Sequence, residues 1–186
     1  MGRAVNLVVS CTSRKRYEAA PGLAAHRLVG TDVQARLRTW KELLSATPEE
    51  KYPAEDLYMG EHWSVTRDIA SNASDRGWDL QLWICSAGYG LIRPSTRINS
   101  YQVTFASGTI DSVTAWGRNA SWKWWNGICS YTIPGELAPR SLTATRTIGS
   151  QRCNGNCPMK PFPPTSRMRI GQSNNYKKAR SKPPTR

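Results

Sequence analysis

Two short apolar runs constrain the fold of this chain more than any other feature of its sequence. The first covers residues 5–10 and leads into Cys11, and the second covers residues 80–84 and leads into Cys85. Each run is apolar and is followed by a polar loop, which is the pattern of a buried strand in a parallel sheet. Ligands of open α/β sheets bind beyond the carboxyl ends of such strands. We therefore expect the two loops to share one rim of a sheet and to face a common site.

Helical patterns separate and follow these two runs. Residues 31–46 and residues 61–75 repeat apolar side chains at helical spacing, and Thr109 is suited to begin a third helix running from Ile110 towards Trp124. This order of elements predicts an α/β fold with three layers, in which helices flank a central parallel or mixed sheet.

The charge is distributed unevenly along the chain. The net charge is +13, from 26 Lys and Arg against 13 Asp and Glu, but residues 1–142 hold 16 of these basic residues and all of the acidic ones. Residues 143–186 are basic and rich in proline, and they contain too few apolar side chains to form a core. We therefore expect an α/β domain at 1–142 and a disordered tail at 143–186.

Several classes of protein are disfavoured by composition. No run approaches the roughly 20 apolar residues of a membrane helix, and the first residues do not resemble a signal peptide, so we expect a cytoplasmic protein without a membrane partner. The five cysteines are odd in number and irregularly spaced, which disfavours a disulfide framework. Cys153 and Cys157 have no histidine near them, so we predict neither a metal site nor another cofactor.

The loop after the first run is the strongest candidate for ligand contact. It combines hydroxyls, cations and an aromatic ring in the order Cys11, Thr12, Ser13, Arg14, Lys15, Arg16 and Tyr17. Hydroxyls, backbone N–H groups and cations bind phosphate oxygens, and a tyrosine can stack on a base. The alternative interpretation is an ordinary solvated turn.

Three further segments could carry chemistry, each with a structural alternative. Residues 86–91 are rich in glycine and could approach a ligand closely, although glycines also form ordinary turns. Asp56 could act as a general base, but we favour a role in capping the helix that follows it. The tryptophans within residues 122–125 could stack on single-stranded bases, although clustered aromatic residues belong more often to a core.

Four motifs together resemble an uncharacterised domain family of bacteria and phages, over roughly residues 4–125. The motifs are Cys11-Thr12-x-x-Lys15, Pro53-Ala54-x-x-Leu57-Tyr58-x-Gly60, Ser86-Ala87-x-Tyr89-Gly90-Leu91, and Tyr101. In that family the chain beyond the tryptophan-rich helix continues with a strand and a helix. Here the basic tail takes their place, which is the pattern expected of a chain truncated or shifted in reading frame near Leu142 and leaves the expected fold incomplete.

The segment from Cys11 to Tyr17 is also similar, more distantly, to the strand and Cys-Ser-x-x-Lys-Pro-Tyr stretch of the archaeosine synthase core. Residues 90–94 resemble a later segment of that core, which has the three-layer fold of uracil-DNA glycosylases. Those enzymes hold an extruded base in a pocket at the strand ends. The glycosylase motif Gly-Gln-Asp-Pro-Tyr, which supplies the usual water-activating aspartate, is absent from this loop.

This resemblance implies roles for individual residues. Asp56 would orient a water molecule, Arg14 and Lys15 would hold the backbone of the nucleic acid, and Tyr17 or Tyr89 would stack on the base. The full set of implied substrate contacts is Cys11, Thr12, Ser13, Arg14, Lys15, Tyr17, Tyr58, Ser86, Tyr89, Gly90 and Tyr101.

The resulting functional hypothesis is a base-processing protein similar to a DNA glycosylase, acting on DNA rather than RNA, with phage defence as its expected role. Two alternatives stay open. One is a nucleic-acid-binding module without catalytic activity, and the other is an enzyme that acts on a free nucleotide.

Overall fold

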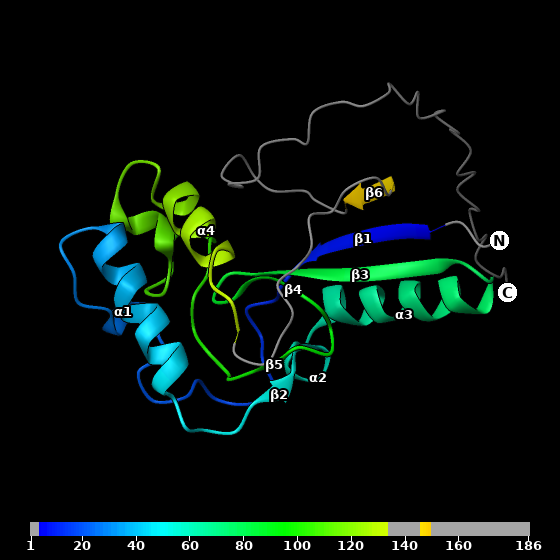
Figure 1. The fold of residues 1–186 in the computed structure, drawn as a ribbon, viewed down its shortest axis with the longest axis horizontal. Coiled ribbons are helices and arrows are strands. Elements are labelled where there is room, and N and C mark those ends of the chain that lie inside the picture. The colour runs from blue at the N-terminus through cyan, green and yellow to red at the C-terminus, as the bar shows by residue number, and fades with distance from the viewer. Residues whose placement is uncertain (1–3, 134–145, 150–186) are drawn as a thin grey trace, which may run out of the picture.

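The computed structural model describes residues 4–133 and 146–149, and its sheet is mixed (Figure 1). Strand β1 (Ala4–Ser10) pairs in parallel with β3 (Asp79–Ser86), and β4 (Gly90–Ile92) returns antiparallel to β3. Strand β6 (Arg146–Gly149) pairs in parallel with the other edge of β1, giving the order β4-β3-β1-β6. The structure thus confirms an α/β fold with a mixed sheet, and both strands predicted from the apolar runs are present.

Strand β6 lies within the segment for which we expected no order. The rest of residues 143–186 lies outside the described residues, as do Cys153 and Cys157.

Two of the three predicted helices form where the periodicity places them. They are α1 (Val33–Ala46) and α3 (Glu61–Asp75). The side chain of Asp32 caps α1 by accepting a hydrogen bond from the N–H of Ala35 at 2.8 Å. Shorter elements complete the fold: η1 (Ala25–Arg27), β2 (Tyr52–Pro53), α2 (Ala54–Leu57), β5 (Arg97–Ile98), η2 (Val113–Trp116) and α4 (Ala120–Cys129).

The third predicted helix is wrong in its extent. It does not begin at Thr109 but divides into η2, capped by the side chain of Ser112, and α4. Between them Gly117 has a φ of 112° and Asn119 a φ of 59°, and neither value is compatible with a continuous right-handed helix. The helix therefore breaks at Gly117, although the helical spacing of apolar residues continues through this position.

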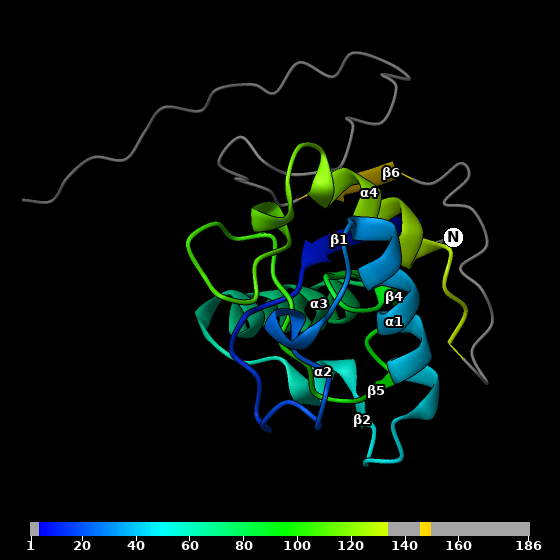
Figure 2. The same cartoon turned by 90° about the vertical axis from the view of Figure 1, so that its left-hand side faces the viewer.

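The helices occupy two different positions relative to the sheet. Helix α3 packs along one face of the sheet, whereas α1 and α4 pack against each other beyond the carboxyl ends of β1 and β3 (Figures 1 and 2). Gly127 permits this close approach of α1 and α4, because a Cβ atom there would overlap the side chain of Leu37. None of the helices in the described ranges is both long and apolar enough to cross a bilayer.

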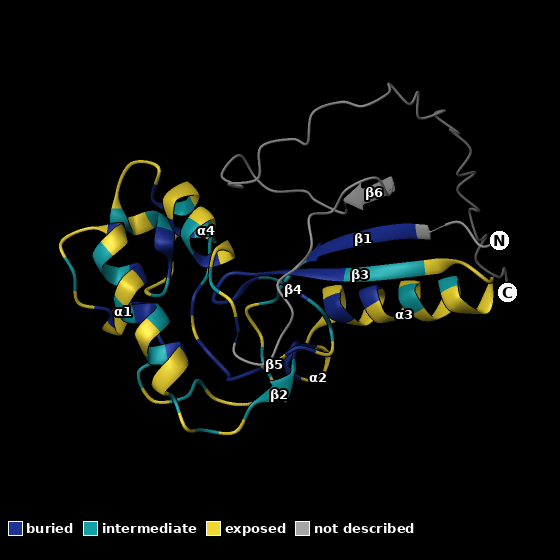
Figure 3. Ribbon diagram, in the orientation of Figure 1, coloured by how far each residue is buried: buried dark blue, intermediate teal, exposed yellow. Residues whose placement is uncertain are grey.

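The sheet carries buried side chains on both faces, and along β3 burial increases towards the carboxyl end. Figure 3 shows β3 changing from exposed at Asp79 to buried at Ser86. Leu7 and Ile84 belong to the main core, while Val8 and Trp83 form a second cluster on the opposite face. The carboxyl end of β3 therefore enters the interior, whereas β1 is buried as far as Val9 and half-buried at Ser10.

Candidate functional site

The loops that follow β1 and β3 lie side by side. We call residues 11–17 the basic loop and residues 86–90 the buried loop. The N–H of Cys11 donates to the carbonyl of Cys85 at 3.1 Å, and the N–H of Ala87 donates to the Cys11 Sγ at 3.4 Å. This contact follows from the register of the parallel pair, in which Ser10 lies opposite Cys85. The two loops thus share one rim, as the sequence predicts.

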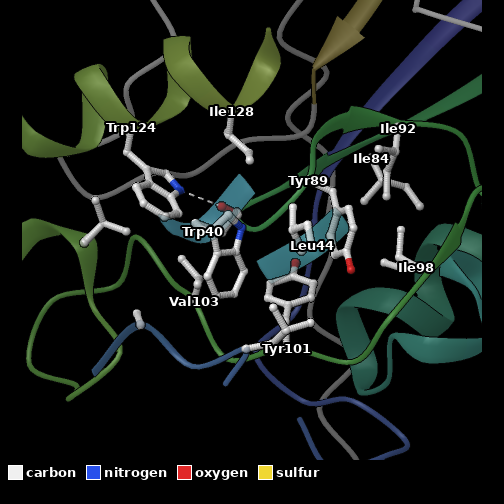
Figure 4. Packing of buried hydrophobic residues seen from close by; sticks show 14 of the residues in the cluster. Trp40, Leu44, Ile84, Tyr89, Ile92, Ile98, Tyr101, Val103, Trp124 and Ile128 are labelled. Carbon is white, nitrogen blue, oxygen red and sulfur yellow. Dashed lines mark hydrogen bonds between the residues drawn. The ribbon is translucent and has the colours of Figure 1, made fainter. Parts of the chain in front are cut away.

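The buried loop is held by two indole groups from the helices beyond the sheet. Trp124 of α4 donates its Nε1–H to the carbonyl of Ala87 at 2.8 Å (Figure 4). Trp40 of α1 donates its Nε1–H to the carbonyl of Gly88, also at 2.8 Å. Both tryptophans are fully buried. Two carbonyls that a loop would otherwise expose to water are therefore satisfied inside the core.

The glycines of this loop are explained by close packing. A Cβ atom at Gly88 would lie 2.7 Å from the ring of Tyr101. Gly90 has a φ of 78°, and a Cβ there would lie 3.0 Å from the backbone of Cys129. Only glycine fits both positions, so the spacing of these glycines does not itself indicate phosphate binding.

Three hydroxyl groups beneath the two loops form a buried hydrogen-bonded cluster, which we call the hydroxyl cluster: Tyr58, Ser86 and Tyr101. The Tyr58 hydroxyl lies 3.1 Å from the Ser86 Oγ and 3.0 Å from the Tyr101 hydroxyl, and the Ser86 Oγ lies 2.8 Å from the Tyr101 hydroxyl. Burial raises the pKa of both phenols well above the ordinary value, so both stay protonated. Each hydroxyl can donate once and accept once around the ring.

Lys15 joins the basic loop to this cluster. Its Nζ lies 4.2 Å from the ring centroid of Tyr101 and 5.9 Å from that of Tyr58, the residue opposite Lys15 in an antiparallel bridge. Burial lowers the pKa of the amine, and the charges of Cys11 and Asp111 oppose that shift. One residue from each of the four sequence motifs therefore meets at a single place, the set Lys15, Tyr58, Ser86 and Tyr101.

Most of the other side chains of the basic loop face solvent. Ser13, Arg14 and Arg16 are exposed, while Thr12 is half-buried and its hydroxyl donates to the carbonyl of Arg14 at 2.8 Å. Backbone hydrogen bonds also hold this loop against the segment that contains Tyr58: the Arg16 N–H donates to the Leu57 carbonyl at 2.9 Å, and the N–H of Met59 donates to the carbonyl of Arg14 at 3.1 Å. The two guanidinium groups thus extend from a fixed backbone.

The two tyrosines proposed to stack on a base differ in access. Tyr17 stacks on Tyr52 with ring centroids 4.0 Å apart and 21° between planes, and it is 41% exposed. Tyr89 is buried, and its hydroxyl accepts from the Asn99 N–H at 3.0 Å. Burial raises the Tyr89 pKa as well. Of the two rings, Tyr17 alone has a face that a ligand could reach.

The capping role that we favoured for Asp56 is wrong. Asp56 lies in the first turn of α2, and the residue that precedes α3 is Gly60, which offers no side chain for a cap. Asp56 is exposed and directly precedes Leu57, whose carbonyl binds the basic loop. Its carboxylate is therefore accessible to water, on the residue next to the one that binds the basic loop.

Two histidines have contacts that the sequence did not indicate. The Asp111 Oδ1 accepts from the His26 backbone N–H at 3.1 Å and lies 2.8 Å from His26 Nδ1. His62 Nε2 lies 3.4 Å from the Ser10 Oγ at the end of β1. Their partners are 85 and 52 residues away in the sequence, so no local motif could have found them. Throughout the described ranges, no group of three or more His, Cys, Asp or Glu could hold a metal ion.

The tryptophans of α4 take different positions. Trp124 belongs to the core and Trp125 is half-buried, whereas Trp122 is exposed. The alternative that clustered tryptophans form a core thus holds for Trp124, while Trp122 could still contact a ligand.

A comparison with known protein families gives one match, which covers part of the candidate site. Residues 44–123 match the model of a family of unknown function, DUF6884. The match spans α2, the buried loop and Tyr101, and it supports the assignment to an uncharacterised domain family. The searches of curated proteins and of solved structures found no match.

Proposed function

We propose that this protein binds nucleic acid, DNA in preference to RNA, along the rim formed by the basic loop. The observation that carries the proposal is the alternation of exposure in this loop: Arg14 and Arg16 are exposed on a backbone fixed by residues 57–59, while Lys15 between them turns inward. Guanidinium groups bind phosphate oxygens through two parallel hydrogen bonds, and a fixed backbone reduces the entropy lost on binding. The arrangement suits two neighbouring phosphates.

The stacked pair Tyr17 and Tyr52 supports the same interpretation. Tyr17 directly follows Arg16 in the sequence, and its ring is 41% exposed although it stacks on Tyr52. A base stacked on an aromatic side chain contributes about 1–3 kcal/mol to binding, with little dependence on sequence. A surface that holds both phosphate and base selects a nucleic acid over a simple anion.

The test is a binding measurement on the full chain with fluorescently labelled single-stranded DNA, double-stranded DNA and RNA. The double variant Arg14→Ala/Arg16→Ala is compared with Arg67→Ala/Arg76→Ala, which removes two exposed arginines at α3 and its end. All variants keep the ten basic residues of 143–186, so a difference between them reports on the loop. We expect the loop variant to bind DNA about tenfold more weakly at low salt, and the control to bind within about twofold of the wild type.

Equal affinity of the two double variants would contradict the proposal. Displacement of DNA by mononucleotides at the same site would instead favour the alternative of an enzyme acting on a free nucleotide. RNA bound more tightly than DNA of the same sequence would reverse the expected preference.

A second candidate function, base processing at this rim, is favoured by the position of Asp56. Its exposed carboxylate borders the basic loop and could orient a water molecule towards a bound nucleotide. The test is incubation with DNA that contains modified and unmodified bases, followed by scoring of abasic sites. We expect Asp56→Asn to abolish the product, and Glu55→Gln, at the neighbouring exposed carboxylate of α2, to retain it. Binding without product would exclude base excision.

A further inference from the structure

The amine of Lys15 has surroundings unlike those of a surface lysine. It lies above the ring of Tyr101, and its nearest oxygen contacts are long, at 3.4 Å to the carbonyl of Thr12 and 3.5 Å to that of Ser13. Within residues 4–133 and 146–149, no carboxylate forms an ion pair with it, because the Asp111 carboxylate pairs with His26. The ammonium form therefore gives up hydration without gaining an anionic partner in contact.

This environment makes the amine a better nucleophile than an ordinary lysine. Burial lowers its pKa, although the charges of Cys11 and Asp111 work in the opposite direction. At a given pH, a larger share of the amine is therefore neutral and carries an available electron pair. Desolvation of a lysine beside apolar rings is one of the ways in which proteins activate this side chain.

The position of the amine indicates which electrophile it would meet. Lys15 lies between Arg14 and Arg16 in the sequence. Its side chain turns inward but is only half-buried, so the amine lies beneath the strand that the two arginines hold in the proposed function. The sugar of a nucleic acid lies between two phosphates along the strand, so a strand held by both guanidinium groups brings a sugar towards this amine. A sugar that has lost its base opens to an aldehyde, which is the carbonyl group that amines attack most readily.

We propose that Lys15 forms an imine with the aldehyde carbon of an abasic nucleotide held at the basic loop. This inference rests on the proposed function, because the flanking phosphates are what bring the sugar to the amine. It adds a covalent role to a residue for which the resemblance implied only a contact with the backbone of the nucleic acid.

The step is balanced without another reactant. The electron pair of the neutral amine attacks the C1′ carbon, and one proton passes from the nitrogen to the carbonyl oxygen to give a carbinolamine. The C–O bond then breaks, the hydroxyl group leaves as water with the second proton of the nitrogen, and the nitrogen forms a double bond to carbon. Addition of water reverses both steps and releases Lys15 unchanged. The rings of Tyr58 and Tyr101 can stabilise the positively charged form of the imine as they do the ammonium group.

The experiment traps this imine on the full chain. The protein is mixed with a single-stranded oligonucleotide that contains one abasic site, sodium borohydride is added to reduce the imine to a stable amine, and the product is separated on a denaturing gel. Digestion and mass spectrometry then locate the adduct on the wild-type chain. We expect the adduct on the peptide that contains Lys15.

Two variants sharpen the result. Lys15→Arg keeps a cation above Tyr101 but cannot form the imine, so we expect at least about a tenfold loss of trapped product with retained DNA binding. Lys123→Arg changes an exposed lysine of α4 in the same way, and we expect unchanged trapping. Mapping on the wild-type chain keeps the test decisive even where Lys15→Arg fails to fold.

Three outcomes would overturn the inference. An adduct mapped to another amine would do so, as would wild-type protein that binds the abasic oligonucleotide without being trapped; both leave the proposed function intact. Reduction of glycolaldehyde phosphate onto Lys15, with no binding or trapping of any DNA, would show a reactive amine that serves a free sugar phosphate. That last result would show that the aldehyde does not come from a nucleic acid, and it would contradict the proposed function as well.

Discussion

The basic loop and the buried loop begin alike and end as opposite kinds of structure. Both lie at the carboxyl end of a strand of one parallel pair, where a cysteine is followed by a hydroxyl residue: Cys11 and Thr12 in one case, Cys85 and Ser86 in the other. Indoles from α1 and α4 cover the buried loop, whereas the basic loop is held through its backbone by residues 57–59 and exposes its cations. Whether the loop after a strand becomes part of the core or of the surface is decided by what packs on it, more than by its glycine content.

The largest effect that this comparison predicts is on stability, at the indole that holds the buried loop. We expect Trp124→Ala to lower the free energy of unfolding by about 3–5 kcal/mol, because it leaves a cavity and removes the hydrogen bond to the carbonyl of Ala87. Trp122→Ala, two residues away on the exposed side of α4, should change it by less than about 0.5 kcal/mol. Urea unfolding followed by fluorescence measures both, and equal losses would show that α4 does not enclose this loop.

The same substitution in each loop gives the next largest contrast. Ser86→Ala removes a partner of Tyr58, Tyr101 and the Tyr89 N–H in a buried place, so we expect a loss of about 1–3 kcal/mol. Ser13→Ala changes an exposed serine of the basic loop and should cost less than about 0.5 kcal/mol. Thermal unfolding of the two variants decides the point. A stable Ser86→Ala protein would mean that the hydroxyl cluster contributes little to the fold.

Much of the fold could be predicted because its signals are local. The strand predicted at the first apolar run matches β1, and helical spacing placed α1 and α3, since burial of one face depends on near neighbours in sequence. The third helix failed at Gly117, where the backbone takes a positive φ although the apolar spacing continues through it. Periodicity describes which side chains are buried, not whether the backbone between them is continuous.

The candidate site could be predicted only as a set of residues. Motif resemblance selected Lys15, Tyr58, Ser86 and Tyr101, and the structure brings them into contact. Sequence reasoning could not separate the exposed Tyr17 from the buried Tyr89, because the difference comes from contacts with distant segments. The contacts of His26 with Asp111 and of His62 with Ser10 could not be predicted for the same reason, because their partners lie 85 and 52 residues away in the sequence.

A further prediction concerns the salt dependence of DNA binding. Each of Arg14→Ala and Arg16→Ala should reduce the slope of the logarithm of the binding constant against the logarithm of salt concentration by about 1, because each guanidinium releases counterions from a phosphate. Neither change should alter stability, since both side chains are exposed. Arg67→Ala on α3 serves as the control, and its slope should equal that of the wild type. Titrations at several salt concentrations measure the slopes, and an unchanged slope in the loop variants would assign the contacts to another surface.

The smallest expected effect is the dependence of stability on pH through Lys15. Because burial lowers the pKa of Lys15 in the folded protein below the ordinary value of 10.5, the unfolded chain binds one more proton between the two values, and stability rises with pH across that interval. The slope for one proton cannot exceed about 1.4 kcal/mol per pH unit. Tyr58 and Tyr101 act in the opposite direction: burial raises their pKa above 10.0, so stability falls as the pH increases beyond that value.

Lys15→Met should therefore abolish the rise in stability below pH 10 and leave the fall above it, whereas Lys123→Met should retain both. Urea unfolding at a series of pH values measures these slopes. If stability still rises with pH in Lys15→Met, the titrating group is a residue other than Lys15. The electrostatic contrast between Lys15 and the exposed arginines on either side of it would then be removed.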